Sequence, residues 1–347
     1  MSVITIIGAG MMGSAMCFPA SDNAHEVRLV GTPLDREIID AAGATGRHIK
    51  LNMNLPEGVK YYQTEQTDEA LDGADLLIGG VSSFGVDWFG ENILPKIPEA
   101  LPVLSVTKGL RALEDGTLEP FPHYLMRCYS NGRRLSLNAI GGPCTSYELA
   151  AGHQTHVAFC GENYETLVKL RGMLSTGYYH ITASTDVRGV ECAVAMKNAY
   201  ALGVTLAVGL SEKIRGEGMA DDYNAQAALF GQSVYEMGRV LELVGADSGN
   251  IIFGAGDLYV TIFGGRTRKI GTLLGRGMTY TEAARQLEGI TLESVVIARE
   301  SVKAIKILSQ NGKADINDFP LLMHIGELIN DGKTANVPWE SFTHDRK

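Results

Sequence analysis

Hydrophobic and polar positions divide the chain into two halves with different periodicities. The first half alternates short, continuous apolar runs with helical segments, and each run ends in a turn signal. Apolar strands of this kind, alternating with helices, are typical of a parallel, doubly wound α/β sheet that is covered on both faces. We therefore predict such a sheet, with strands over residues 3–8, 25–31, 74–82, 101–109, 135–143 and 156–161.

The pattern changes after about residue 186, where apolar positions recur at helical spacing and few strand signals remain. This change predicts two domains, 1–186 and 187–347, of which the second is all-helical. Its most apolar segment, residues 191–212, is long enough to span a membrane. Because Lys197 and Asn198 interrupt this segment and the chain offers no second candidate, we interpret it as a buried core helix and predict no membrane contact.

Composition narrows the class of protein. The 347 residues, 45% hydrophobic and 20% charged, are ordinary for a globular enzyme. The formal net charge of −10 argues against nucleic-acid binding, which usually needs a basic patch. Five scattered cysteines without a CxxC pair, and a start without a basic signal region, favour a reducing, cytoplasmic location. His153 and His156 have no third ligand candidate, so we predict no metal site.

A glycine-rich motif follows the first predicted strand. Gly8, Gly10 and Gly13 have G-x-G-x-x-G spacing, with Met11 and Met12 between the last two. Placed between a strand and a helix, this motif permits a tight turn and lets a pyrophosphate approach the backbone at a helix N-terminus. The alternative is a tight turn without a ligand. The context favours a dinucleotide-binding Rossmann domain.

The end of the second predicted strand bears on the choice of dinucleotide. NAD-binding domains usually carry an acidic residue there, but the expected position falls on Gly31 or Thr32. Thr32 and Arg36 can instead hold the 2′-phosphate of NADP. This favours NADP and leaves NAD open, since Arg36 also fits a solvated charge on a helix.

Four polar segments interrupt the apolar runs and carry the candidate chemistry. Lys108 ends a predicted strand, at the edge where open α/β sheets bind ligands, although alone it fits a surface lysine. A Gly-Pro turn spans 141–148, and the third segment is Lys197 with Asn198. In the fourth segment, Asp257 and Thr261 share a helix face, and Gly264-Gly265 is expected to end that helix. Three basic residues then predict a flexible loop that captures a phosphate or stays solvated: Arg266, Arg268 and Lys269.

These segments together suggest a reaction. Burial and a neighbouring cation such as Lys108 both disfavour the charged form of a lysine. A lysine in that setting can exchange a proton with an alcohol near neutral pH. With Lys197 in this role, a nicotinamide exchanging the hydride and an arginine holding a distal anion, the chemistry is alcohol–ketone oxidoreduction.

The chain resembles the NAD(P)-dependent glycerol-3-phosphate dehydrogenases in an ordered set of segments from Gly8 to about Glu293. The matching segments are "GAGMMGSA", "TKGL", "GGP" with "YELA", "ECAVAMKNAYALGV", "YNAQAAL", "GAGDLYVT" and "GGRTRKIG". The resemblance implies a homodimer of two-domain chains acting on a small phosphorylated substrate. It also implies Lys197 as the proton acceptor, with Lys108 and Asp257 completing the catalytic set.

The same resemblance assigns further residues to the two ligands. On the substrate side it implies Lys108, Gly142, Cys144, Asn198, Asp257, Thr261, Gly265, Arg266 and Thr267. On the cofactor side it implies, beside the glycine motif with Met11 and Met12, these residues: Thr32, Arg36, Ser82, Lys108, Ser146, Arg266 and Glu293.

Several positions depart from the family pattern and bear on the substrate. The family has asparagine at Thr267, commonly serine at Cys144, and basic residues at Gln226 and Gln232. A phosphorylated triose is the expected substrate, and a larger phosphorylated or carboxylated polyol is the alternative. β-Hydroxyacid and 6-phosphogluconate dehydrogenases also use a helix lysine, but their asparagine lies one turn later than Asn198. A non-catalytic nucleotide sensor would need no proton acceptor.

Overall fold

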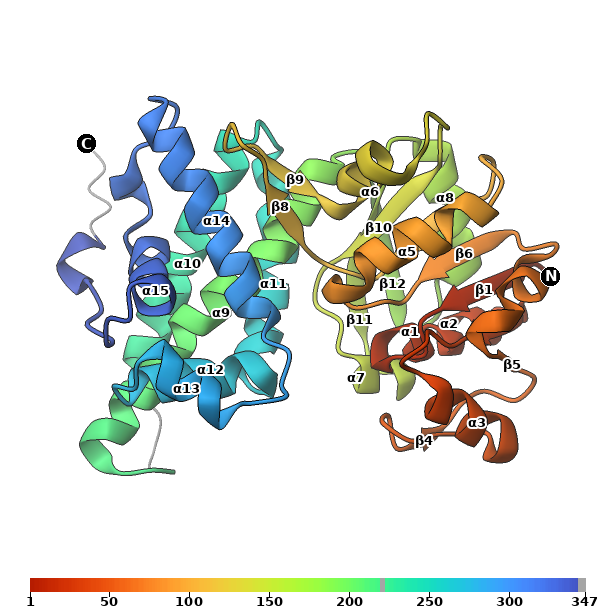
Figure 1. The fold of residues 1–347 in the computed structure, drawn as a ribbon, viewed down its shortest axis with the longest axis horizontal. Helices are drawn as coiled ribbons and strands as arrows, with labels where there is room; N and C mark the ends of the chain where they lie inside the picture. Colours follow the sequence, from red (N-terminus) through yellow and green to blue (C-terminus); the bar gives the residue numbers. More distant parts are fainter. Residues whose placement is uncertain (219–221, 343–347) are drawn as a thin grey trace. The chain divides into compact units, whose positions relative to one another are not determined.

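The computed structural model describes residues 1–218 and 222–342, which form two compact units. The sheet unit comprises Met1–Lys108 and Pro120–Glu191, and the helical unit comprises Gly109–Glu119 and the chain from Cys192 onward. The helices and strands of both are drawn in Figure 1. The chain therefore leaves the sheet unit for a short excursion, 109–119, which the proposed boundary between residues 186 and 187 did not include.

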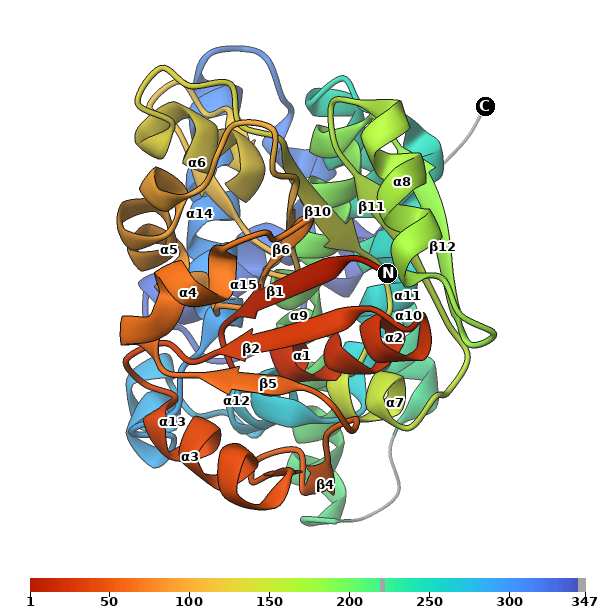
Figure 2. The same cartoon turned by 90° about the vertical axis from the view of Figure 1, so that its right-hand side faces the viewer.

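The sheet unit is built on eight strands in the order β12-β11-β10-β7-β6-β1-β2-β5. All neighbouring pairs are parallel except β10 with β11. Figure 2 shows β1, β2 and β5 side by side. The strands are β1 Val3–Ile7, β2 Glu26–Val30, β5 Lys60–Tyr62, β6 Leu76–Gly79, β7 Val103–Ser105, β10 Leu137–Gly141, β11 Thr155–Cys160 and β12 Tyr179–Ser184.

Helices and short connections cover this sheet. Two apolar clusters of buried side chains pack against it, one containing Ile4 and Ile6 and the other containing Ile7 and Leu77. Because alternate residues of β1 enter different clusters, both faces are buried, as the continuous apolar runs predicted. The other elements are α1 Met11–Ala15, α2 Cys17–Asp22, α3 Arg36–Thr45, β3 Arg47–His48, β4 Met53–Asn54, α4 Thr67–Leu71, α5 Val86–Asn92, α6 Phe121–Tyr129, α7 Ser146–Ala150 and α8 Tyr164–Leu174.

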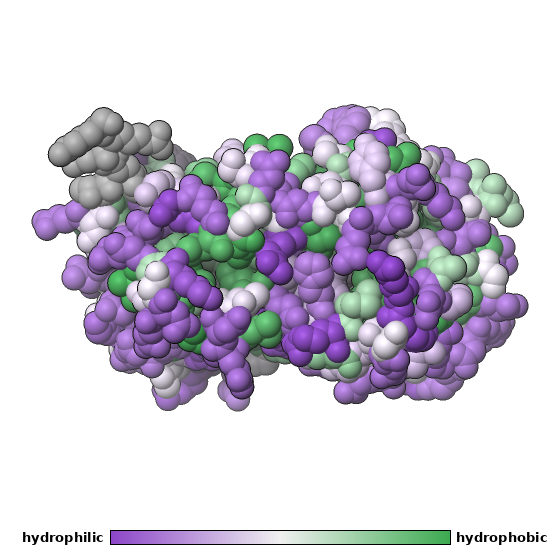
Figure 3. Space-filling view, turned by 90° about the horizontal axis from the view of Figure 1, so that it is seen from above, coloured by the Kyte–Doolittle hydropathy of each residue, from purple (hydrophilic) through white to green (hydrophobic). Residues whose placement is uncertain are grey.

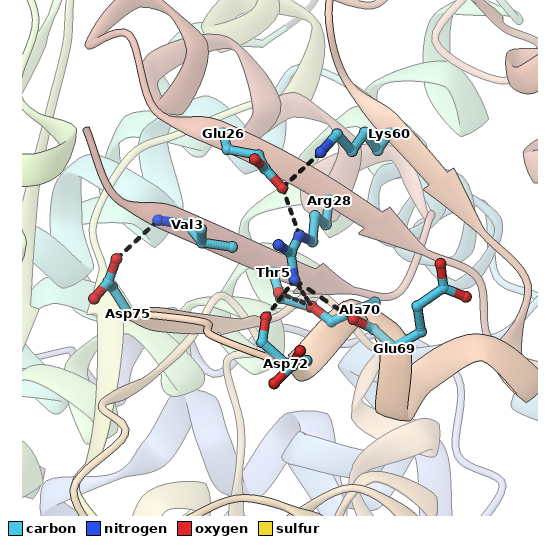
Figure 4. Close-up of polar contacts among 9 residues, drawn as sticks. All are labelled: Val3, Thr5, Glu26, Arg28, Lys60, Glu69, Ala70, Asp72 and Asp75. Carbon is cyan, nitrogen blue, oxygen red and sulfur yellow. Dashed lines mark hydrogen bonds and ion pairs between the residues drawn. The ribbon is translucent and has the colours of Figure 1, made fainter.

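Polar contacts join β1 and β2 to the end of α4, and Figure 4 shows their arrangement. The Arg28 guanidinium donates to Glu26 Oε1 at 2.8 Å and to the carbonyl of Asp72 at 2.6 Å. The Thr5 hydroxyl donates to the carbonyl of Ala70 at 2.5 Å, and Lys60 pairs with Glu26 at 2.9 Å. The bonds to Ala70 and Asp72 satisfy carbonyls at the end of α4 that the helix itself leaves without partners.

The helical unit packs around one long apolar helix. Its helices are α9 Val187–Arg215, α10 Tyr223–Leu243, α11 Ile251–Ile262, α12 Gly265–Gly275, α13 Tyr280–Gln286, α14 Glu293–Gln310 and α15 Pro320–Asn330. Only α9, among the described residues, is long and apolar enough to cross a membrane, and 89% of its most apolar window is buried. The face of the molecule in Figure 3 is largely hydrophilic. The prediction of a core helix is therefore confirmed.

The described residues from 187 onward form helices and no strands, as predicted, but the helical unit also contains the excursion 109–119 from earlier in the chain. This hairpin consists of β8 Leu110–Ala112 and β9 Leu118–Pro120. The Ala112 amide donates to Glu300 Oε2 of α14 at 2.7 Å, and Lys303 of the same helix donates to the Ala112 carbonyl at 3.3 Å. Side chains far along the sequence fix this hairpin, and the local pattern of residues 101–109 gave no indication of that pairing.

Candidate active site

The glycine-rich turn lies at the carboxyl end of β1. Gly8 has φ +110°, and a Cβ on it would lie 2.6 Å from the carbonyl carbon of Gly80. A Cβ on Gly13 would lie 2.1 Å from the Gly8 carbonyl oxygen. Only glycine fits at either position, which is the close helix–strand packing that the dinucleotide motif requires. Met11 is exposed, and Met12 is half-buried.

The strands on either side of β1, β2 and β6, carry further candidate residues at their carboxyl ends. Thr32 follows β2, and its hydroxyl donates to Asp35 Oδ2 at 2.6 Å. Arg36 opens α3 and pairs with Glu65, and both side chains are more than half exposed. Ser82 follows β6 and is exposed. The three candidate residues therefore lie beside the glycine turn, because β6, β1 and β2 are adjacent in the sheet.

The structure brings Lys108 and the Gly-Pro turn together. Lys108 follows β7, and its ammonium group donates to the Gly142 carbonyl, after β10, at 2.7 Å. Cys144 is half-buried, and Ser146 is buried at the start of α7. Parallel pairing of β7 with β10 explains the contact, since both strands end at the same edge.

Lys197 and Asn198 interrupt an otherwise buried helix. Every residue from 189 to 209 is buried except these two. Lys197 Nζ lies 2.5 Å from Asp257 Oδ1, with the aspartate side chain 1% exposed and the lysine side chain 14% exposed. An adjacent carboxylate stabilises an ammonium group. The expectation that burial and a second cation alone set the charge of Lys197 was therefore incomplete, because it omitted this ion pair.

Close helix packing explains how two residues 60 positions apart meet. A Cβ on Gly254, in α11, would lie 2.8 Å from the Ala193 carbonyl oxygen of α9. The two helices therefore approach closely one turn before Lys197 and Asp257. Thr261, one turn later in α11, donates from its hydroxyl to the Asp257 carbonyl at 2.7 Å. Asp257 and Thr261 thus follow one another along α11, as their spacing predicted.

The basic segment after Gly264 is not the flexible loop that we predicted. Gly264 is the N-cap of α12, so Arg266, Arg268 and Lys269 lie in the first turns of a helix. The glycine pair ends α11 but also begins the next helix, which the loop prediction overlooked. Cations are unfavourable at a helix N-terminus, where free amides and the helix dipole favour an anion. This arrangement can therefore hold a phosphate better than a loop can.

The side chains around this N-terminus are mostly accessible. Arg266 is half-exposed, and its Nη2 lies 3.9 Å from Oε2 of Glu293, the first residue of α14. Thr267 is half-buried. Arg268 is turned back, since its Nη1 donates to the Ile262 carbonyl at 3.0 Å. Arg266 and Lys269 are thus the exposed cations of this segment, and Arg266 is the nearer of the two to the start of the helix, with Gly265 beside it.

Sequence reasoning missed a buried carboxylate in the same unit. Glu236 of α10 is fully buried and accepts hydrogen bonds from Tyr200 of α9, from Gln232, and from the first amides of α15, Leu321 and Leu322. Burial raises the pKa of Glu236 to about 7, although these four donors oppose the shift. The sequence did contain a signal for it, because Glu236 is a charged residue placed between Tyr235 and Met237 in an apolar helical segment. Tyr200 lies one turn after Lys197, so this network anchors the lysine's helix.

One cavity of the sheet unit lies at the amino ends of the strands, whereas the glycine turn lies at the carboxyl end of β1. It has a volume of about 610 Å³ and is lined by residues at the amino ends of β7 and β10, including Pro102 and Leu137. The candidate residues of the sheet unit follow the carboxyl ends of the strands. This cavity is therefore separate from them.

Comparisons with known proteins match both halves of the chain to one family. The family models described as NAD-dependent glycerol-3-phosphate dehydrogenase N-terminus and C-terminus match residues 3–167 and 186–339. A protein named NADP(+)-dependent glycerol-3-phosphate dehydrogenase from Archaeoglobus fulgidus is 31% identical, with 98% of this chain and 99% of that protein covered. One named glycerol-3-phosphate dehydrogenase [NAD(P)+], from Desulfotalea psychrophila, is 28% identical over 96% of this chain and 94% of its own.

Solved structures share the fold. Glycerol-3-phosphate dehydrogenase from Plasmodium falciparum superposes with a TM-score of 0.79 at 19% identity, covering 99% of this chain and 96% of that one. The Coxiella burnetii enzyme gives a TM-score of 0.76 at 23% identity, with 98% and 97% covered. Both family models together account for most of the residues. The chain belongs to the NAD-dependent glycerol-3-phosphate dehydrogenase family.

Proposed function

We propose that this protein interconverts sn-glycerol 3-phosphate and dihydroxyacetone phosphate with NAD(P). Family membership supports the reaction class, an oxidoreduction of a secondary alcohol. The observation that carries the proposal is the Lys197–Asp257 pair. Lys197 and Asn198 are the partly accessible residues of an α9 segment, 189–209, that is otherwise buried, and the buried Asp257 of α11 holds the lysine.

Lys197 has the chemistry of the proton acceptor. In the oxidative direction the substrate hydroxyl loses its proton to Lys197 Nζ while the same carbon loses a hydride. A bound nicotinamide supplies or accepts that hydride. Asp257 stabilises the ammonium group formed on Lys197, and its burial restricts the lysine to one position. In the reductive direction the ammonium returns the proton to the new alkoxide oxygen.

The substrate phosphate is proposed to bind at the N-terminus of α12. Three cations in the first turns oppose the helix dipole, and a bound dianion would relieve that repulsion while accepting bonds from free amides. Arg266 is the exposed cation nearest the start of the helix, with Gly265 and Thr267 on either side. Asn198 and Thr261 complete the proposed substrate contacts in this unit, and Lys108, Gly142 and Cys144 those in the sheet unit.

The cofactor is proposed to bind along the glycine turn, with NADP favoured over NAD. Thr32 engages Asp35, so the first acidic side chain after β2 is already occupied by the protein. The Archaeoglobus fulgidus relative, by its name, uses NADP. Arg36 is proposed to exchange its exposed partner Glu65 for the 2′-phosphate. Ser82, Lys108, Ser146, Arg266 and Glu293 are the remaining proposed contacts.

We also propose a cytoplasmic homodimer. One face of α11 supports the dimer, because Ile252, Tyr259 and Phe263 repeat at helical spacing and are each about 60% exposed. Asp257, the one charged residue of α11, faces the other way and is buried. Sedimentation velocity measures this directly, and a monomer at micromolar concentration would refute the dimer.

The reaction is tested by following NADPH and NADH oxidation with dihydroxyacetone phosphate, dihydroxyacetone and a β-keto acid. We expect turnover that depends on the phosphate. Equal rates with free dihydroxyacetone would refute the phosphate site at Arg266. Preference for the keto acid would favour the β-hydroxyacid alternative, and cofactor binding without turnover on any substrate would favour a sensor.

A further inference from the structure

The backbone of the glycine turn is held by two buried side chains from outside the motif. Ala9, between Gly8 and Gly10, is fully buried. Its amide donates to Asp35 Oδ2 at 3.2 Å, and its carbonyl accepts from His48 Nε2 at 2.9 Å. The backbone N–H and C=O of Ala9 are therefore both hydrogen-bonded, the first to Asp35 and the second to His48.

Asp35 links this turn to the next strand end. The same Oδ2 atom accepts from the Thr32 amide at 3.0 Å and from the Thr32 hydroxyl at 2.6 Å. Asp35 is 8% exposed, so these bonds lie largely out of water. One carboxylate oxygen thus sets the distance between Ala9 and Thr32, which belong to the pyrophosphate and ribose parts of the proposed cofactor site.

His48 is held in one tautomer. It is fully buried, and its Nδ1 faces the Leu51 amide at 2.9 Å. An amide can only donate, so Nδ1 accepts and Nε2 carries the proton that goes to the Ala9 carbonyl. Burial lowers the pKa of His48, which keeps the ring neutral and suited to one donated and one accepted bond.

We propose that His48 and Asp35 are positioning residues for the cofactor, which together fix the Ala9 peptide so that the turn is formed before the dinucleotide binds. This inference rests on the proposed cofactor site. A turn formed in advance lowers the entropic cost of binding. Neither residue belongs to the glycine motif, and His48 lies 39 positions from Ala9.

Two substitutions separate the bonds that His48 makes. Glutamine can place its amide nitrogen near Nε2 and so keep the donor to Ala9. Asparagine can place its oxygen near Nδ1 and keep the acceptor for Leu51, but it cannot reach Ala9. We expect His48→Asn to raise the Kd for NADPH roughly tenfold, equivalent to about 1.4 kcal/mol, and His48→Gln to raise it less than threefold.

His25 offers a matched control within the same unit. Its Nδ1 accepts from the Ser2 amide at 3.2 Å, and its Nε2 contacts the Met173 carbonyl at 2.9 Å. His25 precedes β2, so it lies at the amino end of that strand, away from the glycine turn. His25→Asn should lower the melting temperature without changing the Kd for NADPH. A merely structural role for His48 would make His48→Asn behave in the same way.

The experiment titrates the full-length wild type and these variants with NADPH by fluorescence, and measures kcat with dihydroxyacetone phosphate at saturating cofactor. We expect kcat to stay within twofold. Wild-type Kd in folded His48→Asn, or equal losses in the Asn and Gln variants, would overturn the proposal. If His48→Asn does not fold, Asp35→Ala tests the other side of the peptide, and an unchanged Kd there overturns it too. A wild type that binds no dinucleotide would instead refute the proposed function itself.

Discussion

Glu236 provides a prediction whose size follows from the structure. Its carboxylate is fully buried between α9, α10 and α15, and burial raises its pKa from 4.5 to about 7. At 1.36 kcal/mol per pKa unit, ionising the carboxyl in the folded state lowers the free energy of unfolding by about 3 kcal/mol. Because the folded-state pKa lies above the unfolded-state value, the unfolded chain releases its proton first. Stability should therefore fall as the pH rises from about 4.5 to about 7.

The Glu236→Gln variant isolates this effect because it resembles the protonated acid. Its amide nitrogen can donate to the Tyr200 oxygen, as a protonated carboxyl would, but has no lone pair for the Leu322 amide. We expect a cost of about 1 kcal/mol at pH 5 from that lost hydrogen bond. Between pH 5 and 8 the wild type should lose about 3 kcal/mol relative to the variant.

Differential scanning calorimetry of both proteins across this pH range measures the effect. For a unit of this size, a change of about 3 kcal/mol moves the melting temperature by about 6–12 °C. A Glu236→Gln variant whose melting temperature tracks the wild type at a constant offset would refute the reasoning. It would show that the four donors keep the carboxylate charged throughout.

Three further predictions concern the proposed ligand sites. Asp257→Asn removes the charge facing Lys197, so kcat should fall at least tenfold while NADPH affinity stays within twofold; wild-type turnover would exclude Asp257 from the chemistry. Thr267→Asn restores the family residue beside Arg266 and should lower the KM for dihydroxyacetone phosphate severalfold without changing the KM for NADPH; a raised KM would place the substrate phosphate elsewhere. Arg36→Ala should raise the KM for NADPH roughly tenfold and leave that for NADH unchanged, whereas equal changes would mean that Arg36 serves only its pair with Glu65.

Much of the fold could be predicted because strands that are buried on both faces of a sheet consist of consecutive apolar residues. Strands such as Val3–Ile7 and Leu76–Gly79 are continuous apolar runs, and the glycine motif follows the first of them. The antiparallel strand β11 could not be told from a parallel one, since both are buried alike. The hairpin 109–119 was missed because Glu300 and Lys303, nearly 200 positions away, hold it.

The candidate site was predictable where a residue conflicts with its surroundings. Lys197 stood out because a charge in an apolar helix needs a reason, and the structure places a buried carboxylate against it. Asp257 was a candidate, but its direct contact with Lys197 could not be inferred, because that contact depends on how closely α9 and α11 pack. His48 and Glu236 gave weaker signals, since a single polar residue in a mixed segment is common. Their roles come from bonds to backbone groups that only the folded chain brings near.

The central claim, that Lys197 carries the proton in the reaction, is tested most directly by Lys197→Ala. The variant should bind NADPH with near wild-type affinity, because the cofactor turn lies in the sheet unit. Its kcat for reduction of dihydroxyacetone phosphate should fall by a factor on the order of 10² to 10⁴, the usual contribution of a general acid or base. A folded Lys197→Ala enzyme that keeps more than a tenth of wild-type kcat would contradict the account.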